Sequence, residues 1–156
     1  MNGIQLPVSV RTYQITKPKL SILYPVIVEL PNPQVQQKIN QTILNEVYKL
    51  LQTQGYGQNP MTESTGYYEI KSNERGIFSL SLFNYSFSGG AHGLTLQKSL
   101  TFNTETGKLY PLQELFKPGS DYISRLSMIV KEQIKRRDIP LLVEFNQIRP
   151  DQDFYI

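Results

Sequence analysis

The chain has 156 residues, with 16 basic and 13 acidic residues, a net charge of +3 and no cysteine. This length predicts one domain that buries enough surface to fold on its own. The absence of cysteine excludes disulfides, thiolate metal sites and thiol catalysis, and the small net charge argues against a nucleic-acid partner.

The start of the chain carries no targeting pattern. Residues 1–7 lack the charged region and the apolar region of a secretory signal, and no apolar run in the sequence is long enough to span a bilayer. We therefore expect no membrane insertion. The localisation stays open: cytoplasmic for the chain as written, or extracytoplasmic if it is cut from an exported precursor.

The first third of the chain predicts two strands and a helix. Residues 8–15 alternate apolar and polar side chains, and residues 20–30 are rich in Ile, Val and Tyr. Pro25 cannot donate to a ladder, so it places the second strand at an edge or at a bulge. Asn32 is a suitable N-cap and Pro33 a suitable first helical residue, and apolar residues then recur at helical spacing down to Gln54.

The middle of the chain predicts three further strands at residues 67–71, 76–87 and 94–103. In the second of these the apolar side chains change parity, since Phe78, Leu80 and Leu82 give way to Phe83 and Tyr85. This shift indicates either a bulge or burial on both faces of the sheet.

The last third predicts a short helical turn at residues 112–116 and a helix that begins at Ser120-Asp121. Its inward positions are Ile123, Leu126, Ile129, Val130 and Ile134. Residues 153–156 read as the start of a strand. The predicted class is α+β, an antiparallel meander with two main helices on one face and its final strands missing at the C-terminus. We expect a single domain over 1–156, with a first module at about 7–100 and the start of a second at about 100–156.

The segment 88–93, Ser-Gly-Gly-Ala-His-Gly, is the most distinctive stretch of the sequence. It places Gly89, Gly90, Gly93 and the only histidine, His92, between two predicted strands. A loop with so few Cβ atoms serves unusual backbone angles or a close approach by another group. We expect the ring nitrogens of His92 to hold this glycine turn in place.

Five motifs together resemble one bacterial family. They are residues 29–40, the loop 88–93, Thr-Phe-Asn-Thr-Glu-Thr-Gly-Lys at 101–108, Leu-Gln-Glu-Leu-Phe at 112–116, and Asp-Phe-Tyr at 153–155. The sequence is similar to the two-module family that includes the extracellular domain of the lysozyme-sensing anti-sigma-V factor and the N-terminal region of some peptidoglycan deacetylases. In that family, further strands follow the Phe-Tyr motif.

The resemblance implies a non-catalytic recognition domain without a cofactor. Its expected partner is a protein, for example one like lysozyme, or a cell-wall glycan. We assign ligand binding to the loop residues Gly89, Gly90, His92 and Gly93, together with two tyrosines, Tyr85 and Tyr110. Tyrosine combines a large apolar body with a polar tip and is enriched at contact surfaces.

Catalytic alternatives have weaker support in the residues. His92 lies near Ser86 and Ser88, but no nucleophile-elbow motif and no second histidine accompany them. The carboxylate pairs Glu63 with Glu69 and Asp151 with Asp153 are typical of solvated side chains, and no zinc-ligand spacing occurs. An accessory or hydrolytic domain acting on peptidoglycan, with His92 as the base, remains the alternative function.

A third interpretation is structural. A sheet without its last strands exposes unpaired backbone groups, which can pair with a second chain. This interpretation describes an intracellular protein that self-associates through its C-terminal sheet edge as a homodimer or a strand swap.

Overall fold

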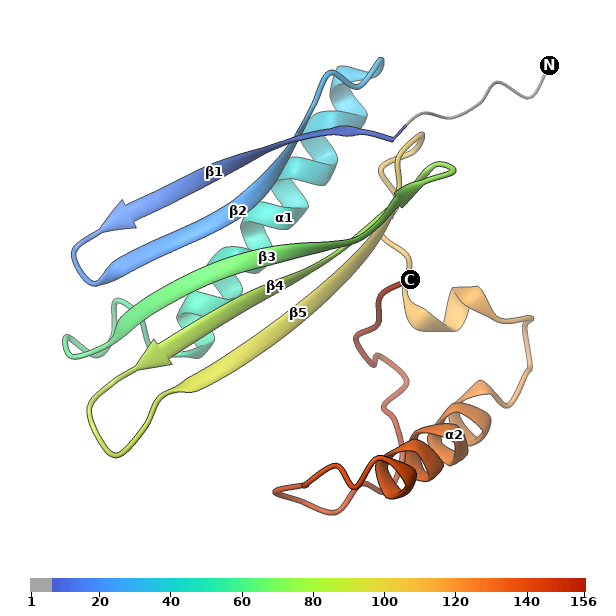
Figure 1. The fold of residues 1–156 in the computed structure, drawn as a ribbon. Coiled ribbons are helices and arrows are strands. Elements are labelled where there is room, and N and C mark those ends of the chain that lie inside the picture. Colours follow the sequence, from blue (N-terminus) through green and yellow to red (C-terminus); the bar gives the residue numbers. More distant parts are fainter. Residues whose placement is uncertain (1–6) are drawn as a thin grey trace. The chain divides into compact units, whose positions relative to one another are not determined.

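The computed structural model describes residues 7–156, which form two compact units. One unit extends to Leu109 and also contains the segment Phe154–Ile156, and the other unit is Tyr110–Asp153. Each unit is described by itself (Figure 1). The expectation that the chain starts without a secretory signal falls mainly on residues 1–6, outside the described residues. The predicted division into modules near residue 100 stays a prediction.

The first unit is a five-stranded sheet in the order β1-β2-β3-β4-β5. The strands are β1 (Ser9–Lys17), β2 (Leu20–Val28), β3 (Glu63–Glu74), β4 (Ile77–Phe87) and β5 (Leu94–Asn103). The α+β class is confirmed, but the sheet is mixed, because β2 pairs with β3 in parallel. The helix α1 (Pro33–Thr53) connects these two strands, and such a crossover brings the chain back in the same direction.

β2 is a local edge where Pro25 lies, as the sequence predicts. Its pairing with β3 covers only Leu20–Ile22, so Pro25 has a strand on the β1 side alone. The backbone of Ile27, two residues further on, bonds to the Asn40 side chain of α1, with both the N–H and the C=O at 2.8 Å. Alternate residues of a strand point their N–H groups the same way. The position where Pro25 lacks an N–H therefore faces away from β1, on the side of β2 where no β3 residue is paired.

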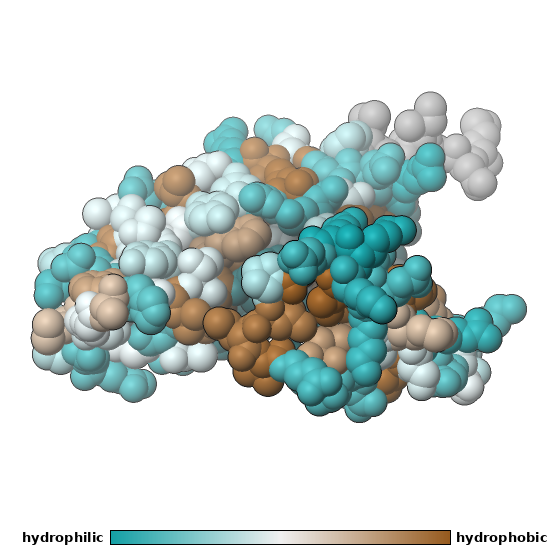
Figure 2. Space-filling view, turned by 60° about the horizontal axis from the view of Figure 1, so that its bottom comes forward, coloured by the Kyte–Doolittle hydropathy of each residue, from teal (hydrophilic) through white to brown (hydrophobic). Residues whose placement is uncertain are grey.

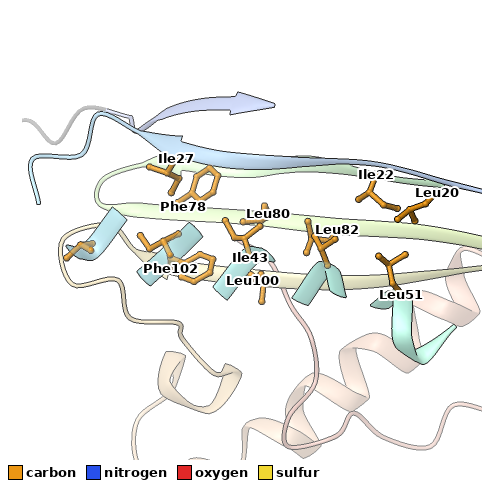
Figure 3. Packing of buried hydrophobic residues seen from close by; sticks show 13 residues of the cluster. Leu20, Ile22, Ile27, Ile43, Leu51, Phe78, Leu80, Leu82, Leu100 and Phe102 are labelled. Atoms are coloured by element: carbon orange, nitrogen blue, oxygen red, sulfur yellow. The ribbon is translucent and has the colours of Figure 1, made fainter. Parts of the chain in front are cut away.

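The core lies between α1 and one face of the sheet. Asn32 caps the helix by accepting hydrogen bonds from the N–H groups of Gln34 and Val35 at 3.0 and 3.3 Å. The buried helix positions are Val35, Ile39, Ile43, Val47 and Leu51. Figure 3 shows residues of this stripe in one cluster with the sheet residues Leu80, Leu82 and Leu100. Each such side chain contributes about 1.5–3 kcal/mol on burial.

β4 is buried on both faces over residues 78–82. Phe78, Leu80 and Leu82 belong to the core, and Ser79 and Ser81 are fully buried on the opposite face. The register shift lies in β3, between Ile70 and Ser72, and not in β4. Of the two explanations for the parity change in the sequence, burial on both faces is therefore the one that applies to β4.

The second unit contains the 3-10 turn η1 (Leu112–Leu115) and the helix α2 (Tyr122–Arg136). Asp121 caps α2 by accepting the N–H of Ser124 at 3.3 Å. The expected inward position Ile129 is wrong, because 49% of its surface is exposed. The buried Ser127 connects α2 to the segment around Ile148. Its hydroxyl donates to the carbonyl of Ile123 at 2.6 Å and accepts the N–H of Ile148 at 2.9 Å.

Residues 153–156 form no strand, in contrast to the sequence prediction. The N–H of Ile156 donates to the hydroxyl of Ser79 at 3.2 Å. The homodimer or strand swap through this edge stays a prediction.

Within residues 7–156, no helix has both the length and the apolar character needed to cross a bilayer. Figure 2 shows hydrophobic residues gathered in the lower middle of one face, among hydrophilic ones.

Candidate functional site

The loop 88–93 joins β4 to β5 at the end of their hairpin. Gly89 and Gly90 adopt φ angles of 84° and 127°, which side chains with a Cβ rarely tolerate. The prediction of unusual backbone angles is therefore confirmed for these two glycines. Gly89 also lies against the Met61 side chain, since a Cβ on it would be 3.0 Å from Met61 Cε.

Gly93 has a different role from the other two glycines, because the Tyr85 ring passes over it. A Cβ on Gly93 would come within 2.5 Å of Tyr85 Cζ and Oη, and within 2.6 Å of the Ser86 carbonyl oxygen. No side chain fits at that distance. The missing side chain at Gly93 therefore leaves the space that the Tyr85 ring occupies, as a close approach predicts.

His92 does not hold the loop in place. Its side chain is exposed, and it makes no hydrogen bond within the described part of the chain. The loop is held from its flanks instead. Thr62 and Ser88 hydrogen-bond each other through their hydroxyls at 2.8 Å, and Gln54 Nε2 donates to the carbonyl of Leu94 at 2.8 Å. The sequence missed these contacts because their partners are 26 to 40 residues apart.

Tyr110 and the loop belong to different units of the structure. Tyr110 is the first residue of the second unit, whereas Tyr85 and the loop belong to the first. Of the two tyrosines assigned to ligand binding, Tyr85 lies beside a loop residue, Gly93. The binding roles of Gly89, Gly90, His92, Gly93, Tyr85 and Tyr110 all stay predictions.

Tyr67, Phe83 and Tyr85 lie on the sheet face that carries Ser79 and Ser81. Tyr85 lies between Thr65 of β3 and Thr95 of β5, and Phe83 lies in the next row between Tyr67 and Gln97. The rings of Tyr67 and Phe83 stack with centroids 4.7 Å apart and an interplanar angle of 10°. Tyr67 and Tyr85 are 47% and 44% exposed. We call Tyr67, Phe83 and Tyr85 the aromatic face.

Lys71 borders this aromatic face from the bulge in β3. It lies between Ile70 and Ser72, where the register with β4 shifts. Its ammonium pairs with Glu69 and lies 5.9 Å from the centroid of Phe83 and 4.6 Å from that of Tyr155. The hydrogen bond to Glu69 is the main cause that raises the pKa of Lys71. Lys71 therefore stays protonated over the physiological range.

The serines near His92 are engaged elsewhere. The hydroxyls of Ser86 and Ser64 hydrogen-bond each other at 2.6 Å, and Ser88 bonds to Thr62. No hydrogen bond of His92 to either serine is found within residues 7–156. The arrangement of nucleophile and base that hydrolysis needs is therefore not formed in this structure.

The carboxylate pair Glu63 and Glu69 also lacks the geometry for glycosidic hydrolysis. Glu63 and Glu69 are six residues apart on one strand, or about 20 Å along it. The two carboxyl groups of a glycosidase are about 5–9.5 Å apart. Asp151 accepts a hydrogen bond from Arg149 Nε at 3.1 Å. Within the described residues, no three His, Asp or Glu side chains are grouped as metal ligands would be.

A protein-family model described as Deacetylase PdaC matches residues 14–95, which is more than half of the chain. The chain belongs to the PdaC family. The matched region includes the aromatic face and the whole β4–β5 loop. The family resemblance that the sequence motifs indicate is thereby confirmed.

A curated relative is the peptidoglycan-N-acetylmuramic acid deacetylase PdaC of Bacillus subtilis (strain 168). It is 32% identical to this chain over 56 residues, which are 35% of the chain and 12% of the relative. The likeness to this relative is therefore confined to a small part of the relative's length.

Two solved structures share the fold. Both are members of the DUF3298 family, one from Pseudomonas aeruginosa PAO1 and one from Bacteroides fragilis NCTC 9343. Each has a TM-score of 0.59 and covers 86% of this chain, with 15% and 10% sequence identity. The chain covers 69% and 71% of them. At these identities the likeness concerns the fold alone.

Proposed function

We propose that this PdaC-family chain is a non-catalytic recognition module of a bacterial cell-envelope protein, which binds its ligand through the β4–β5 loop and the aromatic face. The observation that carries the proposal is the exposed Tyr85 ring, which Gly93 accommodates beside the loop. The match to a peptidoglycan deacetylase supports an envelope context.

The surroundings of Tyr85 suit a binding surface. Met61 and Leu94 are large apolar side chains that are exposed at the same end of the hairpin as the loop. Aromatic residues and Met are enriched at the centres of protein interfaces, and the flexible Met side chain adapts to partners of varied shape. Tyr85 and Leu94 lie on strands that are paired with each other, so they need little ordering when a ligand binds.

Sedimentation with purified peptidoglycan sacculi tests the proposal. The chain should pellet with sacculi, and Tyr85→Ala should reduce the bound fraction at least fivefold. The matched control is Tyr48→Ala on α1, because Tyr48 is as exposed as Tyr85 but lies on another element. Circular dichroism of both variants checks that they are folded.

A protein ligand is tested in the same way, with c-type lysozyme on a biosensor and His92→Ala as the loop variant. Saturable binding that His92→Ala or Tyr85→Ala weakens would support recognition through this surface. The proposal is overturned if both variants bind sacculi and lysozyme as the unmodified chain does, or if neither ligand binds at all. Muropeptide release by the chain that His92→Ala abolishes would also overturn it.

A further inference from the structure

The aromatic face has the spacing of a platform for a chain-like ligand. Phe83 and Tyr85 are two residues apart on β4 and point to the same side of the sheet, which places them about 7 Å apart along the strand. The ring of Tyr67 on β3 stacks face to face with that of Phe83 and covers one side of it, so the exposed aromatic groups of this row are Tyr67 and Tyr85. Successive rings of a linear polysaccharide fit such a row, because the C–H face of a sugar packs against an aromatic ring.

Polar side chains border the rings on both sides. Thr65 and Thr95 flank Tyr85, and Gln97 flanks Phe83; all three are exposed. The Gln97 amide is oriented, since its Nε2 donates to the hydroxyls of Ser81 and Ser99 at 3.3 Å each. Hydroxyl and amide groups can both donate and accept, which is what the hydroxyls of a sugar require of a binding surface.

The charges near the aromatic face favour a neutral ligand. Lys71 is paired with Glu69. At the other end of the face, Glu63 lies in the row beyond Tyr85, and Lys17 and Lys19 line the same hollow as Glu63 and Thr65. A single-stranded nucleic acid also stacks on aromatic rings, but it needs a positively charged groove for its phosphates. Within residues 7–156, the lysines beside these rings lie at the two ends of the face, each near a glutamate, and form no positive groove along the rings, so the aromatic face matches an uncharged chain better.

The chain's own C-terminal segment limits the length of the open surface. Ile156 bonds to Ser79, and the Tyr155 ring lies over Lys71. These contacts occupy the rows of the sheet beyond Phe83. The exposed part therefore extends from the row of Tyr67 and Phe83 to the row of Tyr85, which is about 7 Å and suits a short stretch of a polysaccharide.

We propose that the aromatic face binds a neutral linear polysaccharide, with sugar rings stacked on Tyr67 and Tyr85 and their hydroxyls bonded to Thr65, Thr95 and Gln97. This inference rests on the proposed function and names the chemical class of the ligand. Exposed side chains on an open sheet face contact a strand along its length rather than enclosing a single sugar.

The test uses the N-acetylglucosamine hexamer as the probe, titrated into the full chain and followed by NMR. We expect saturable binding with a Kd of about 1 mM or tighter, with shifts in the ring signals of Tyr67, Phe83 and Tyr85. Tyr67→Ala and Tyr85→Ala should each weaken binding at least tenfold. Tyr13→Ala and Tyr48→Ala are matched controls, because Tyr13 and Tyr48 are 49% and 43% exposed and lie outside the aromatic face.

The folded state of Tyr85→Ala needs its own check, because the ring packs on Gly93. Tyr85→Leu and Tyr67→Leu keep apolar volume but remove the ring, so they should weaken the binding as the alanine variants do. The chemical-shift changes of the unmodified chain also show whether the hexamer contacts these rings, without the need for a variant. If the ligand is neutral, the Kd for the hexamer should change less than twofold between low and physiological salt.

No saturation up to about 10 mM hexamer, or binding that the Tyr67 and Tyr85 variants leave unchanged, overturns the polysaccharide inference. If sacculi or lysozyme still bind in a Tyr85-dependent way, the recognition function stands and only the ligand class is wrong. If sacculi and lysozyme also fail to bind, the proposed function falls with it.

Discussion

The ring of Tyr85 lies so close to Gly93 that a Cβ on the glycine would be 2.5 Å from the phenol oxygen. Gly93→Ala should therefore displace the ring and press on the Ser86 carbonyl, which lowers the free energy of unfolding by about 1–3 kcal/mol. Urea unfolding measures this change. Ala91→Ser, at an exposed position of the same loop, should change it by less than about 0.5 kcal/mol.

A Cβ on Gly93 would clash with both the Tyr85 ring and the Ser86 carbonyl oxygen. Combining Gly93→Ala with Tyr85→Ala removes the first clash and keeps the second. Removing the ring should restore only part of the lost stability, because the Ser86 carbonyl would still be 2.6 Å from the new Cβ. Strict additivity of the two single changes would show that Tyr85 and Gly93 are not coupled.

The Asn40 side chain makes the two backbone hydrogen bonds of Ile27 that a neighbouring strand would otherwise make. It accepts the Ile27 N–H and donates to the Ile27 C=O, and Ile27 is fully buried. Asn40→Ala leaves two buried backbone groups unpaired and should cost about 2–4 kcal/mol. Thermal or urea unfolding measures the loss. Asn45→Ala on the exposed side of the same helix is the control, and an equal loss there would contradict the role of Asn40.

The ion pair of Lys71 with Glu69 predicts a pH dependence of stability at high pH. The pKa of Lys71 is raised above its ordinary value of 10.5, mainly by the hydrogen bond to Glu69. A raised pKa contributes stability that is present below 10.5 and is lost as the pH rises through the higher folded-state value. The stability difference between the unmodified chain and Lys71→Met should therefore shrink in that range.

NMR titration of the Lys71 side chain gives the pKa directly. Glu69→Gln should lower it, because the charged acceptor is gone. Tyr155→Phe keeps the ring beside Lys71 but removes a phenol that contributes less to the raised pKa than Glu69 does, so it should lower the pKa of Lys71 by less than Glu69→Gln does. An unchanged pKa in Glu69→Gln would show that the pair has no effect on Lys71.

His92→Ala should leave the free energy of unfolding within about 0.5 kcal/mol of the unmodified value. The side chain is exposed and makes no hydrogen bond within residues 7–156. Urea midpoints at pH values below and above the ordinary pKa of histidine measure the effect in both charge states. A loss of more than about 1 kcal/mol would show that His92 does hold the glycine turn.

Much of the fold could be predicted from local patterns. Asn32 and Pro33 define the start of α1, and the five buried positions of that helix follow its period. The strand at residues 94–103 and the helix cap at Asp121 are also where the sequence placed them. β3 is longer than predicted, at Glu63–Glu74, because its added residues are ordered by pairing with β4 and not by their own alternation.

The candidate site was only partly predictable. The glycines of the loop 88–93 indicated special backbone angles, and the structure has them at Gly89 and Gly90. The stacking of Tyr67 on Phe83 depends on the register between β3 and β4, and a shift of one residue would place these rings on opposite faces. No local pattern in either strand fixes that register.

The sequence by itself determined the class of the fold, the ends of α1 and the glycine loop, because period, capping and backbone freedom are properties of neighbouring residues. Only the tertiary structure decided that β2 and β3 run parallel, that Asn40 completes the edge of β2, and that Tyr85 rests on Gly93. These features join residues that are distant in the chain. They are set by which surfaces can be buried together and which backbone groups still need a partner.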